Sequence, residues 1–112
     1  SGGKLVIGDN CSISSGVQIY THDTVKWALT GGRSRKQTGG VRIGNDCYIG
    51  PLSVISMGQK IGKCSVIGAL SFVNSTIPPN SIVYGIPARV VGKVRIKGKN
   101  VKFDYYNSNY CK

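Results

Sequence analysis

Isoleucine or valine recurs at every sixth residue along most of this chain. Ile19 and Ile43 lie 24 residues apart, which is four whole steps, so the register continues across an insertion. A six-residue repeat has room for one short strand and one corner, and it can bury side chains only by stacking on copies of itself. The period therefore predicts short strands in stacked parallel coils. The repeat positions are Ile7, Ile13, Ile19, Ile43, Ile49, Ile55, Ile61, Ile67 and Val73.

Neither a helix nor a set of long strands fits this pattern. Helical stripes need spacings of three and four residues, and each glycine inside a helix would cost about 1 kcal/mol. Glycine and asparagine recur too often for long unbroken strands. Both residues tolerate the positive φ angles that tight corners need, so short strands joined by corners are the better prediction.

The repeat is interrupted once and then ends. Residues 24–40 break the register and are rich in glycine and basic residues, so we expect a protruding loop there. Pro78 and Pro79 end the regular repeat, because proline cannot donate to a strand ladder. Residues 82–91 are predicted to form one more irregular turn of the stack. We therefore predict a β-helix domain over 1–92 and a basic strand and tail over 93–112.

The chain is strongly basic, with 15 Lys and Arg against four Asp and a net charge of +11. Such a charge attracts polyanions or phosphorylated ligands, although a merely solvated basic surface is an equal alternative. In the predicted strand 93–102 the cations also discourage edge-to-edge aggregation. Aromatic residues are not interleaved with these cations, so nucleic acid is not an expected partner.

Cysteine usage and hydropathy indicate the compartment. No Cys-x-x-Cys pair is present, and Cys11 and Cys47 share a repeat column with Ser53, Ser65 and Ser71. We interpret both as reduced, buried thiols. No long apolar run or signal peptide is evident, so we expect a cytoplasmic protein without a membrane span.

His22 is the only histidine and the first candidate for catalysis. Acyl transfer from a thioester to a hydroxyl needs a base for the hydroxyl proton, and an imidazole can serve at neutral pH. The sequence places His22 where the regular coils give way to the inserted loop. The alternative is a surface histidine without a role.

Several segments together resemble the hexapeptide-repeat acyltransferases. They are IGNDCYIG at 43–50, IG at 61–62, IGA at 67–69, IPPNSIV at 77–83 and GIPARVV at 85–91. The resemblance implies an all-β left-handed parallel β-helix of about three to four triangular coils. It also implies a homotrimer with an active site in each cleft between neighbouring copies.

Within that family, the segment Ile19 to Asp23 followed by the loop and residues 43–50 looks most like the sugar acetyltransferases. The resemblance implies an acetyl group moved from acetyl-CoA to a hydroxyl of a sugar or surface glycan, with His22 as general base. It places Tyr48 in the same cleft, and Asp23 and Trp27 are further candidates for contact with the acceptor. Backbone amides near the loop or near Gly50 are expected to hold the oxyanion.

The same resemblance supplies the donor site. Acetyl-CoA is expected to contact Pro51, Ala69, Asn74, Ser75 and Arg89, where Arg89 suits a phosphate. Ser75 stands where many relatives carry lysine, and Lys93 is a candidate to compensate.

Other functions remain open. A single histidine cannot supply the several histidines with which the related β-helical carbonic anhydrases bind zinc, so no metal site is expected. Serine acetylation or sugar N-acetylation are alternatives within the enzyme class. A trimeric β-helical binding or assembly module is the alternative outside it.

Overall fold

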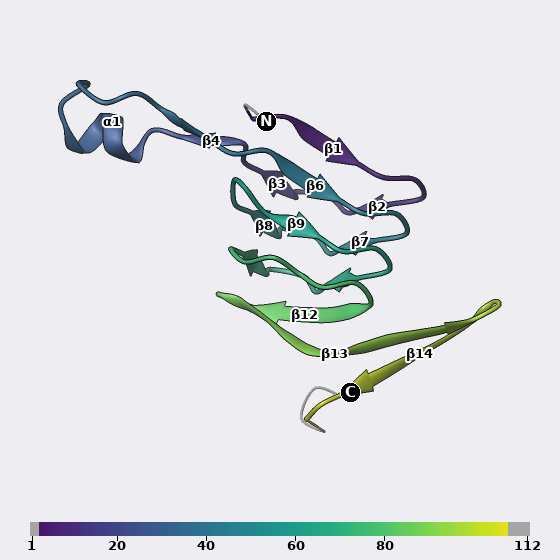
Figure 1. Ribbon diagram of the computed structural model, residues 1–112. Helices are drawn as coiled ribbons and strands as arrows, with labels where there is room; N and C mark the ends of the chain where they lie inside the picture. Colours follow the sequence, from purple (N-terminus) through teal and green to yellow (C-terminus); the bar gives the residue numbers. More distant parts are fainter. Residues whose placement is uncertain (1–2, 108–112) are drawn as a thin grey trace.

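The structure, a computed structural model, describes residues 3–107 and is built almost entirely of short β-strands. The chain winds through three narrow sheets in turn, so the strands stack in triangular coils (Figure 1). The first face holds β1 (Leu5–Ile7), β6 (Val41–Ile43) and β9 (Lys60–Ile61). The second face holds β2 (Ser12–Ile13), β7 (Tyr48–Ile49) and β10 (Val66–Ile67). The third face holds β3 (Gln18–Ile19), β8 (Val54–Ile55) and β11 (Phe72–Val73).

All pairs between these strands are parallel, and the six-residue repeat forms the core. We call the isoleucine or valine of each six-residue repeat its hexad residue. The hexad residues face inward and stack from coil to coil, as Ile13, Ile49 and Ile67 do on the second face. Ile49, Ile55, Ile67 and Val73 are 0% exposed. Ile13 remains 39% exposed, because the first coil is one end of the described stack. The prediction of parallel coils built on the hexads is confirmed.

The small residues of the repeat column fill the corners of the core. Ser53, Ser65 and Ser71 are buried, and the Ser53 hydroxyl donates to the Gly68 carbonyl at 3.0 Å. The Cys47 thiol donates to the Gly62 carbonyl at 3.2 Å in the same way, and burial raises the pKa of this thiol. Cys47 is buried as predicted, whereas Cys11 in the end coil is only half-buried.

The insertion forms a separate ribbon. β4 (His22–Asp23) pairs antiparallel with β5 (Gln37–Thr38), and the short helix α1 (Val25–Leu29) lies between them. Figure 1 shows this segment extending away from the stacked coils. Within residues 3–107 no helix is long enough to cross a membrane, since α1 has five residues.

The C-terminal part departs from the expected further turn. β12 (Ser81–Gly85) stacks parallel on β10, but the chain then reverses, and β13 (Ala88–Lys97) and β14 (Asn100–Tyr105) continue the second sheet antiparallel. The expected further turn over 82–91 is therefore begun by β12 but not completed, because the chain reverses at residues 86–87. The boundary placed between residues 92 and 93 falls inside β13.

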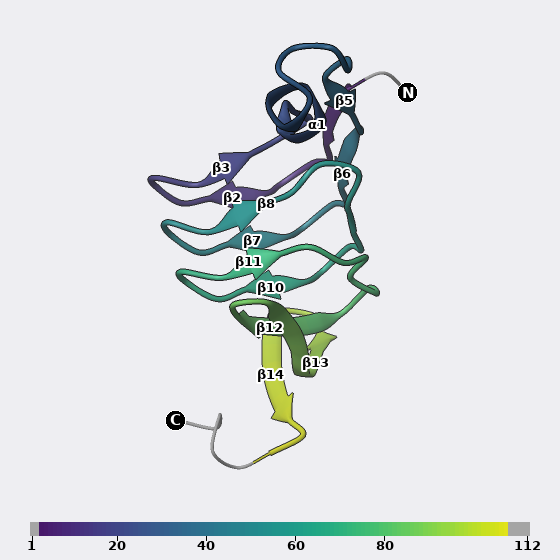
Figure 2. The same cartoon turned by 90° about the vertical axis from the view of Figure 1, so that its left-hand side faces the viewer.

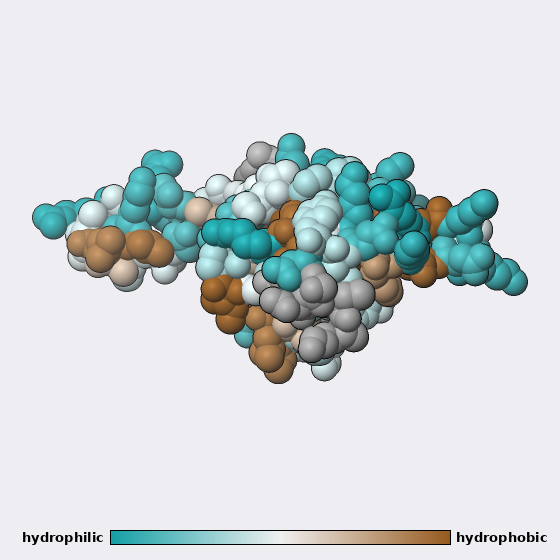
Figure 3. Space-filling model, turned by 90° about the horizontal axis from the view of Figure 1, so that it is seen from below, coloured by the Kyte–Doolittle hydropathy of each residue, from teal (hydrophilic) through white to brown (hydrophobic). Residues whose placement is uncertain are grey.

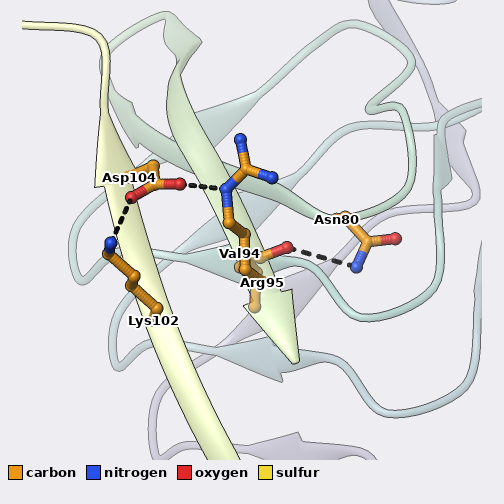
Figure 4. Close-up of polar contacts among 5 residues, drawn as sticks. All are labelled: Asn80, Val94, Arg95, Lys102 and Asp104. Atoms are coloured by element: carbon orange, nitrogen blue, oxygen red, sulfur yellow. Dashed lines mark hydrogen bonds and ion pairs between the residues drawn. The ribbon is translucent and has the colours of Figure 1, made fainter. Parts of the chain in front are cut away.

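Charged side chains line one surface of the β13–β14 ribbon. Arg95 pairs with Asp104, and the Lys102 ammonium lies 4.0 Å from the other oxygen of that carboxylate (Figure 4). The Asn80 side-chain amide donates to the Val94 carbonyl at 3.4 Å and ties the ribbon to the last corner of the stack. Val94 is buried between the exposed Lys93 and Arg95, whereas Ile96 is 50% exposed.

Candidate functional site

His22 lies at the base of the inserted ribbon, where the chain leaves the third face. Tyr20 is held to the stack by its amide, which donates to the Ile55 carbonyl at 2.9 Å. Two residues later, His22 pairs with Thr38 in the antiparallel ribbon, and its side chain is exposed. The register of the coils therefore delivers the imidazole to the edge of the third face.

The imidazole borders two shallow hollows. One hollow of about 230 Å³ runs along the third face and is bordered by Tyr20, His22, Asp23, Val54, Ser56, Met57 and Phe72. The other, of about 340 Å³, lies beside the start of the ribbon and is bordered by residues 20 and 22–25. A histidine next to a partly apolar hollow can act on a ligand that lies on this face.

Sequence analysis did not single out several residues of the first hollow. Val54 and Phe72 point outward from neighbouring strands of the third face, each one residue before a buried hexad residue. Ser56 and Met57 lie in the corner that follows β8. The available signal was the apolar character of Val54 and Phe72 at positions whose side chains face away from the core.

The two other residues proposed near the insertion have clear local roles. The Asp23 carboxylate accepts from the Val25 backbone amide at 3.2 Å, so it shapes the entry to α1. Trp27 lies in α1 and is 52% exposed, and its ring lies against Gly32. Asp23 borders both hollows with His22, whereas Trp27 borders neither.

Tyr48 lies on a different face from His22 within one chain. It belongs to β7 on the second face, and it borders a hollow of about 290 Å³ between that face and the β13–β14 ribbon. The Ser14 hydroxyl donates to the Tyr48 hydroxyl at 3.4 Å. The hollow that Tyr48 borders does not include His22, and the two hollows beside His22 do not include Tyr48.

The residues expected to contact the acyl donor fall into two groups. Ala69 precedes β11, and Asn74 and Ser75 follow it, so these three exposed residues flank the strand that carries Phe72. Pro51 stacks one coil away, where its carbonyl accepts from the Leu70 amide at 3.0 Å. This first group lies at the ends of the third-face strands, but none of its four members borders the His22 hollow.

The second group lies on β13. Arg89 pairs with Tyr84 near the chain reversal, and its guanidinium donates to the Ala88 carbonyl at 3.0 Å. Lys93 pairs with Ser81 at the other end of β12. Both side chains are exposed, but the register separates them by most of the length of β12.

The corner at Gly50 cannot supply oxyanion donors. The Gly50 amide donates to the Ile67 carbonyl at 2.8 Å, and the Leu52 amide donates to the Ser15 carbonyl at 3.1 Å. Pro51 between them has no amide hydrogen. The expectation for this corner is therefore wrong, because coil-to-coil hydrogen bonds already use its amides. Among the described residues, no group of three or more His, Cys, Asp or Glu side chains is arranged to hold a metal ion.

Comparison with known proteins identifies relatives of the whole stack. The galactoside O-acetyltransferase of Escherichia coli K12 is 33% identical over 111 residues, which cover 92% of this chain and 55% of that protein. A chloramphenicol acetyltransferase of Morganella morganii is 33% identical, covering 80% of this chain and 51% of that protein. The chain thus spans about half the length of these curated relatives. No protein-family model matches it.

Solved structures agree with the sequence matches. A galactoside acetyltransferase in complex with coenzyme A superposes with a TM-score of 0.74 at 34% identity, covering 95% of this chain and 51% of that one. A maltose O-acetyltransferase of Clostridium difficile 630 superposes with a TM-score of 0.67 at 29% identity, covering 82% and 60%. These neighbours are left-handed β-helix acetyltransferases. By sequence and by fold, the chain belongs to the hexapeptide-repeat acyltransferases.

Proposed function

We propose that this protein transfers an acetyl group from acetyl-CoA to a hydroxyl of a sugar or surface glycan, with His22 as general base. The observation that carries the proposal is the exposed imidazole of His22 beside the hollow of Tyr20, Met57 and Phe72. The relatedness to acetyltransferases supports the acyl donor, since a neighbouring structure holds coenzyme A.

The reaction needs one proton to move twice. His22 takes the proton of the acceptor hydroxyl while the hydroxyl oxygen attacks the thioester carbonyl carbon. The tetrahedral intermediate collapses, the carbon–sulfur bond breaks, and the imidazolium returns the proton to the departing thiolate. The acetyl group leaves on the acceptor oxygen, and His22 ends neutral. Amides of the inserted segment 24–36 are the remaining candidates to hold the oxyanion.

The acceptor is proposed to lie at the hollow beside the ribbon. Asp23 is proposed to position it either directly or through the turn that its carboxylate forms with Val25. Trp27 offers an exposed aromatic ring on which a sugar can stack. It belongs to α1, which projects from the stacked coils (Figure 1).

The donor is proposed to run along the third face past Pro51, Ala69, Asn74 and Ser75 toward Arg89. The exposed side chains of Asn74 and Ser75 can pair with the amides of the pantetheine arm, and Ala69 leaves room for it. Arg89 is assigned to a phosphate, for which its planar, permanently charged guanidinium is suited. Lys93 lies farther along β13 and is proposed to add to the positive field.

The site is proposed to be completed between copies in a homotrimer. His22 borders the third face, whereas Tyr48 lies on the second, and these are different sheets of one chain. When the second face of one copy lies opposite the third face of another, both residues line one cleft. An aromatic ring opposite His22 then closes the acceptor site from above.

A thiol-release assay tests the proposed activity. We expect acetyl-CoA to yield free thiol in the presence of galactosides or glycans, and not in their absence. Serine and amino sugars are the parallel arms, because the serine acetyltransferase and N-acetylation alternatives predict release with those acceptors. Absence of release with every acceptor, together with no shift of the melting temperature at millimolar acetyl-CoA, would favour the assembly module.

We predict that Arg89→Gln raises the KM for acetyl-CoA about tenfold and changes kcat little. The charge-assisted contact to the phosphate stabilises bound acetyl-CoA equally in the ground state and in the transition state, so its loss weakens binding without slowing the chemical step. Initial rates over a range of acetyl-CoA concentrations measure both constants. Arg42→Gln is the control, since Arg42 is exposed on the first face, away from the donor path. An unchanged KM in Arg89→Gln would remove Arg89 from the donor site.

A further inference from the structure

The β13–β14 ribbon separates its side chains by charge, because successive residues of a strand point to opposite sides. One side holds two apolar cross-strand pairs, which are Val94 with Phe103 and Ile96 with Val101. The other side holds four cations, and the turn between the strands adds a fifth. We call these five exposed residues the basic surface. They are Lys93, Arg95, Lys97, Lys99 and Lys102.

The basic surface points away from the stacked coils. The apolar side of the ribbon faces the second face of the stack, and its four apolar residues border the hollow of about 290 Å³ together with Tyr48 and Val66. The ribbon lies at the end of the stack opposite the inserted segment (Figure 2). Figure 3, seen from this end, shows mainly hydrophilic surface over the ribbon, which projects to the right. The basic surface is therefore open to a large ligand.

The charge of the basic surface is not neutralised within the chain. Asp104 is the only acid in residues 88–107, and Arg95 and Lys102 both pair with it (Figure 4). Among the described residues, the three other cations of the surface form no ion pair. Arg95 and Lys102 are also direct cross-strand partners, and like charges at such positions destabilise a sheet. Cations paired with acids would protect the ribbon edges equally well, so the excess of one sign indicates an anionic ligand.

The basic surface is too long for one small anion. Residues on one side of a strand lie about 7 Å apart, so Lys93, Arg95 and Lys97 span about 13 Å along β13. A single phosphate or carboxylate reaches only one or two of these cations. A polymer with an acidic group on its repeating unit can contact the whole row at once. The surface thus fits a polyanion better than a small ligand.

Among polyanions, an acidic glycan fits this surface best. Single-stranded nucleic acids are held by bases stacked on aromatic rings as well as by cations, and the basic side of residues 93–104 carries no aromatic ring. An anionic membrane would take up the apolar side of the ribbon, but that side faces the coils. The repeated carboxylates of a glycan need only open cations, which this surface offers.

We propose that the basic surface binds an acidic glycan and that this polymer is the acceptor of the acetyl group. This inference rests on the proposed function, for which it names the acceptor class. The protein measures 52 Å along its longest axis, so one glycan chain can lie on the ribbon and reach His22 in β4, at the other end of the stack (Figure 1). Holding the polymer there raises the local concentration of its hydroxyls near His22, which lowers KM without changing the chemical step.

The test is the binding of fluorescently labelled polygalacturonate, measured by anisotropy, to a variant that lacks three cations of the ribbon. We expect the wild type to bind it with an affinity that falls steeply with salt, and neutral dextran not to bind. At about 50 mM salt the variant should bind about tenfold more weakly and with a shallower salt dependence, because it releases fewer counterions. The variant is Lys97→Gln/Lys99→Gln/Lys102→Gln.

The matched control removes the same charge elsewhere. It replaces three exposed cations on or beside the first face, and it should bind polygalacturonate like the wild type. If circular dichroism shows that the ribbon variant fails to fold, the double variant Lys97→Gln/Lys99→Gln at the tip of the ribbon provides the same test. The control variant is Lys4→Gln/Arg42→Gln/Lys60→Gln.

The binding results decide the site and the class of polymer. A wild type that does not bind polygalacturonate, or a control that loses as much affinity as the ribbon variant, overturns the basic surface as a binding site. Tighter binding of single-stranded DNA or of phosphatidylserine vesicles than of polygalacturonate, lost in the ribbon variant, overturns the choice of a glycan.

Acetyl transfer reads out the proposed function separately. We expect the ribbon variant to raise the KM for polygalacturonate about tenfold and to leave kcat and the rate with a small galactoside unchanged. An enzyme that binds polygalacturonate through the ribbon but releases no thiol with any acceptor overturns the acetyltransferase proposal and leaves the binding surface intact. Thiol release with galactosides but with no acidic glycan overturns the acceptor class, and an unchanged KM for polygalacturonate in the ribbon variant overturns the role of the ribbon.

Discussion

His22→Ala is expected to lower the turnover of acetyl transfer by about two to four orders of magnitude, which is the usual contribution of a positioned general base. Alanine cannot take the hydroxyl proton, and the border of the hollow holds no other imidazole, since His22 is the only histidine in the sequence. Single-turnover thiol release at saturating acetyl-CoA measures the chemical step directly.

The variant should lose chemistry and keep binding. Because His22 is exposed and sits in a two-residue strand at the base of the ribbon, its truncation leaves the coil core untouched. We therefore expect unchanged circular dichroism and an unchanged shift of the melting temperature with CoA. Added imidazole should restore part of the rate if the lost group is a base. Lys26→Ala, on the exposed surface of α1, is the matched control and should keep the wild-type rate. A His22→Ala enzyme with more than about a tenth of wild-type turnover would exclude His22 as the base.

The sequence predicted the stack because each short strand buries one hexad residue. The stacking of Ile49 against Ile67 in the next coil therefore follows from the six-residue period alone. It failed at the chain reversal, because valine and isoleucine continue past residue 81 and do not distinguish a parallel strand from an antiparallel return. The separation of His22 from Tyr48 was readable in principle. Ile49 is the hexad residue of a second-face strand, and Ile19 is that of a third-face strand. Tyr48, which precedes Ile49, and His22, which follows Ile19, therefore cannot lie on one face.

The hollow beside His22 was harder to foresee. Tyr20, Met57 and Phe72 come from three different coils, and only their stacking brings them together. Whether these three side chains border the same hollow as His22 depends on the path of the inserted ribbon. The six-residue period carries no information on that path. The prediction that amides near Gly50 hold the oxyanion failed for a related reason. These amides donate to carbonyls of the neighbouring coils, and a short sequence motif does not show which residues lie in those coils.

Gly62→Ala is expected to have the largest effect on stability. A Cβ at this position would lie 2.4 Å from the Pro79 nitrogen and 2.7 Å from the Pro79 Cα, which are backbone atoms of the next coil. The Gly62 amide donates to the Ile77 carbonyl at 2.8 Å, so the two coils cannot separate without losing a hydrogen bond that joins them. We expect the free energy of unfolding to fall by about 3 kcal/mol, at the upper end for overpacking.

Thermal unfolding followed by circular dichroism, at one fixed protein concentration, measures this loss. For a domain of this size the melting temperature should fall by about 10–20 °C. Gly58→Asn is the control: Gly58 has a φ of 79° with no atom within 4 Å of its Cβ position, so asparagine should change the free energy of unfolding by less than about 0.5 kcal/mol. A Gly62→Ala protein that melts within a few degrees of the wild type would show that neighbouring coils can move apart to make room for a Cβ. The spacing of the coils would then not require glycine after a hexad residue.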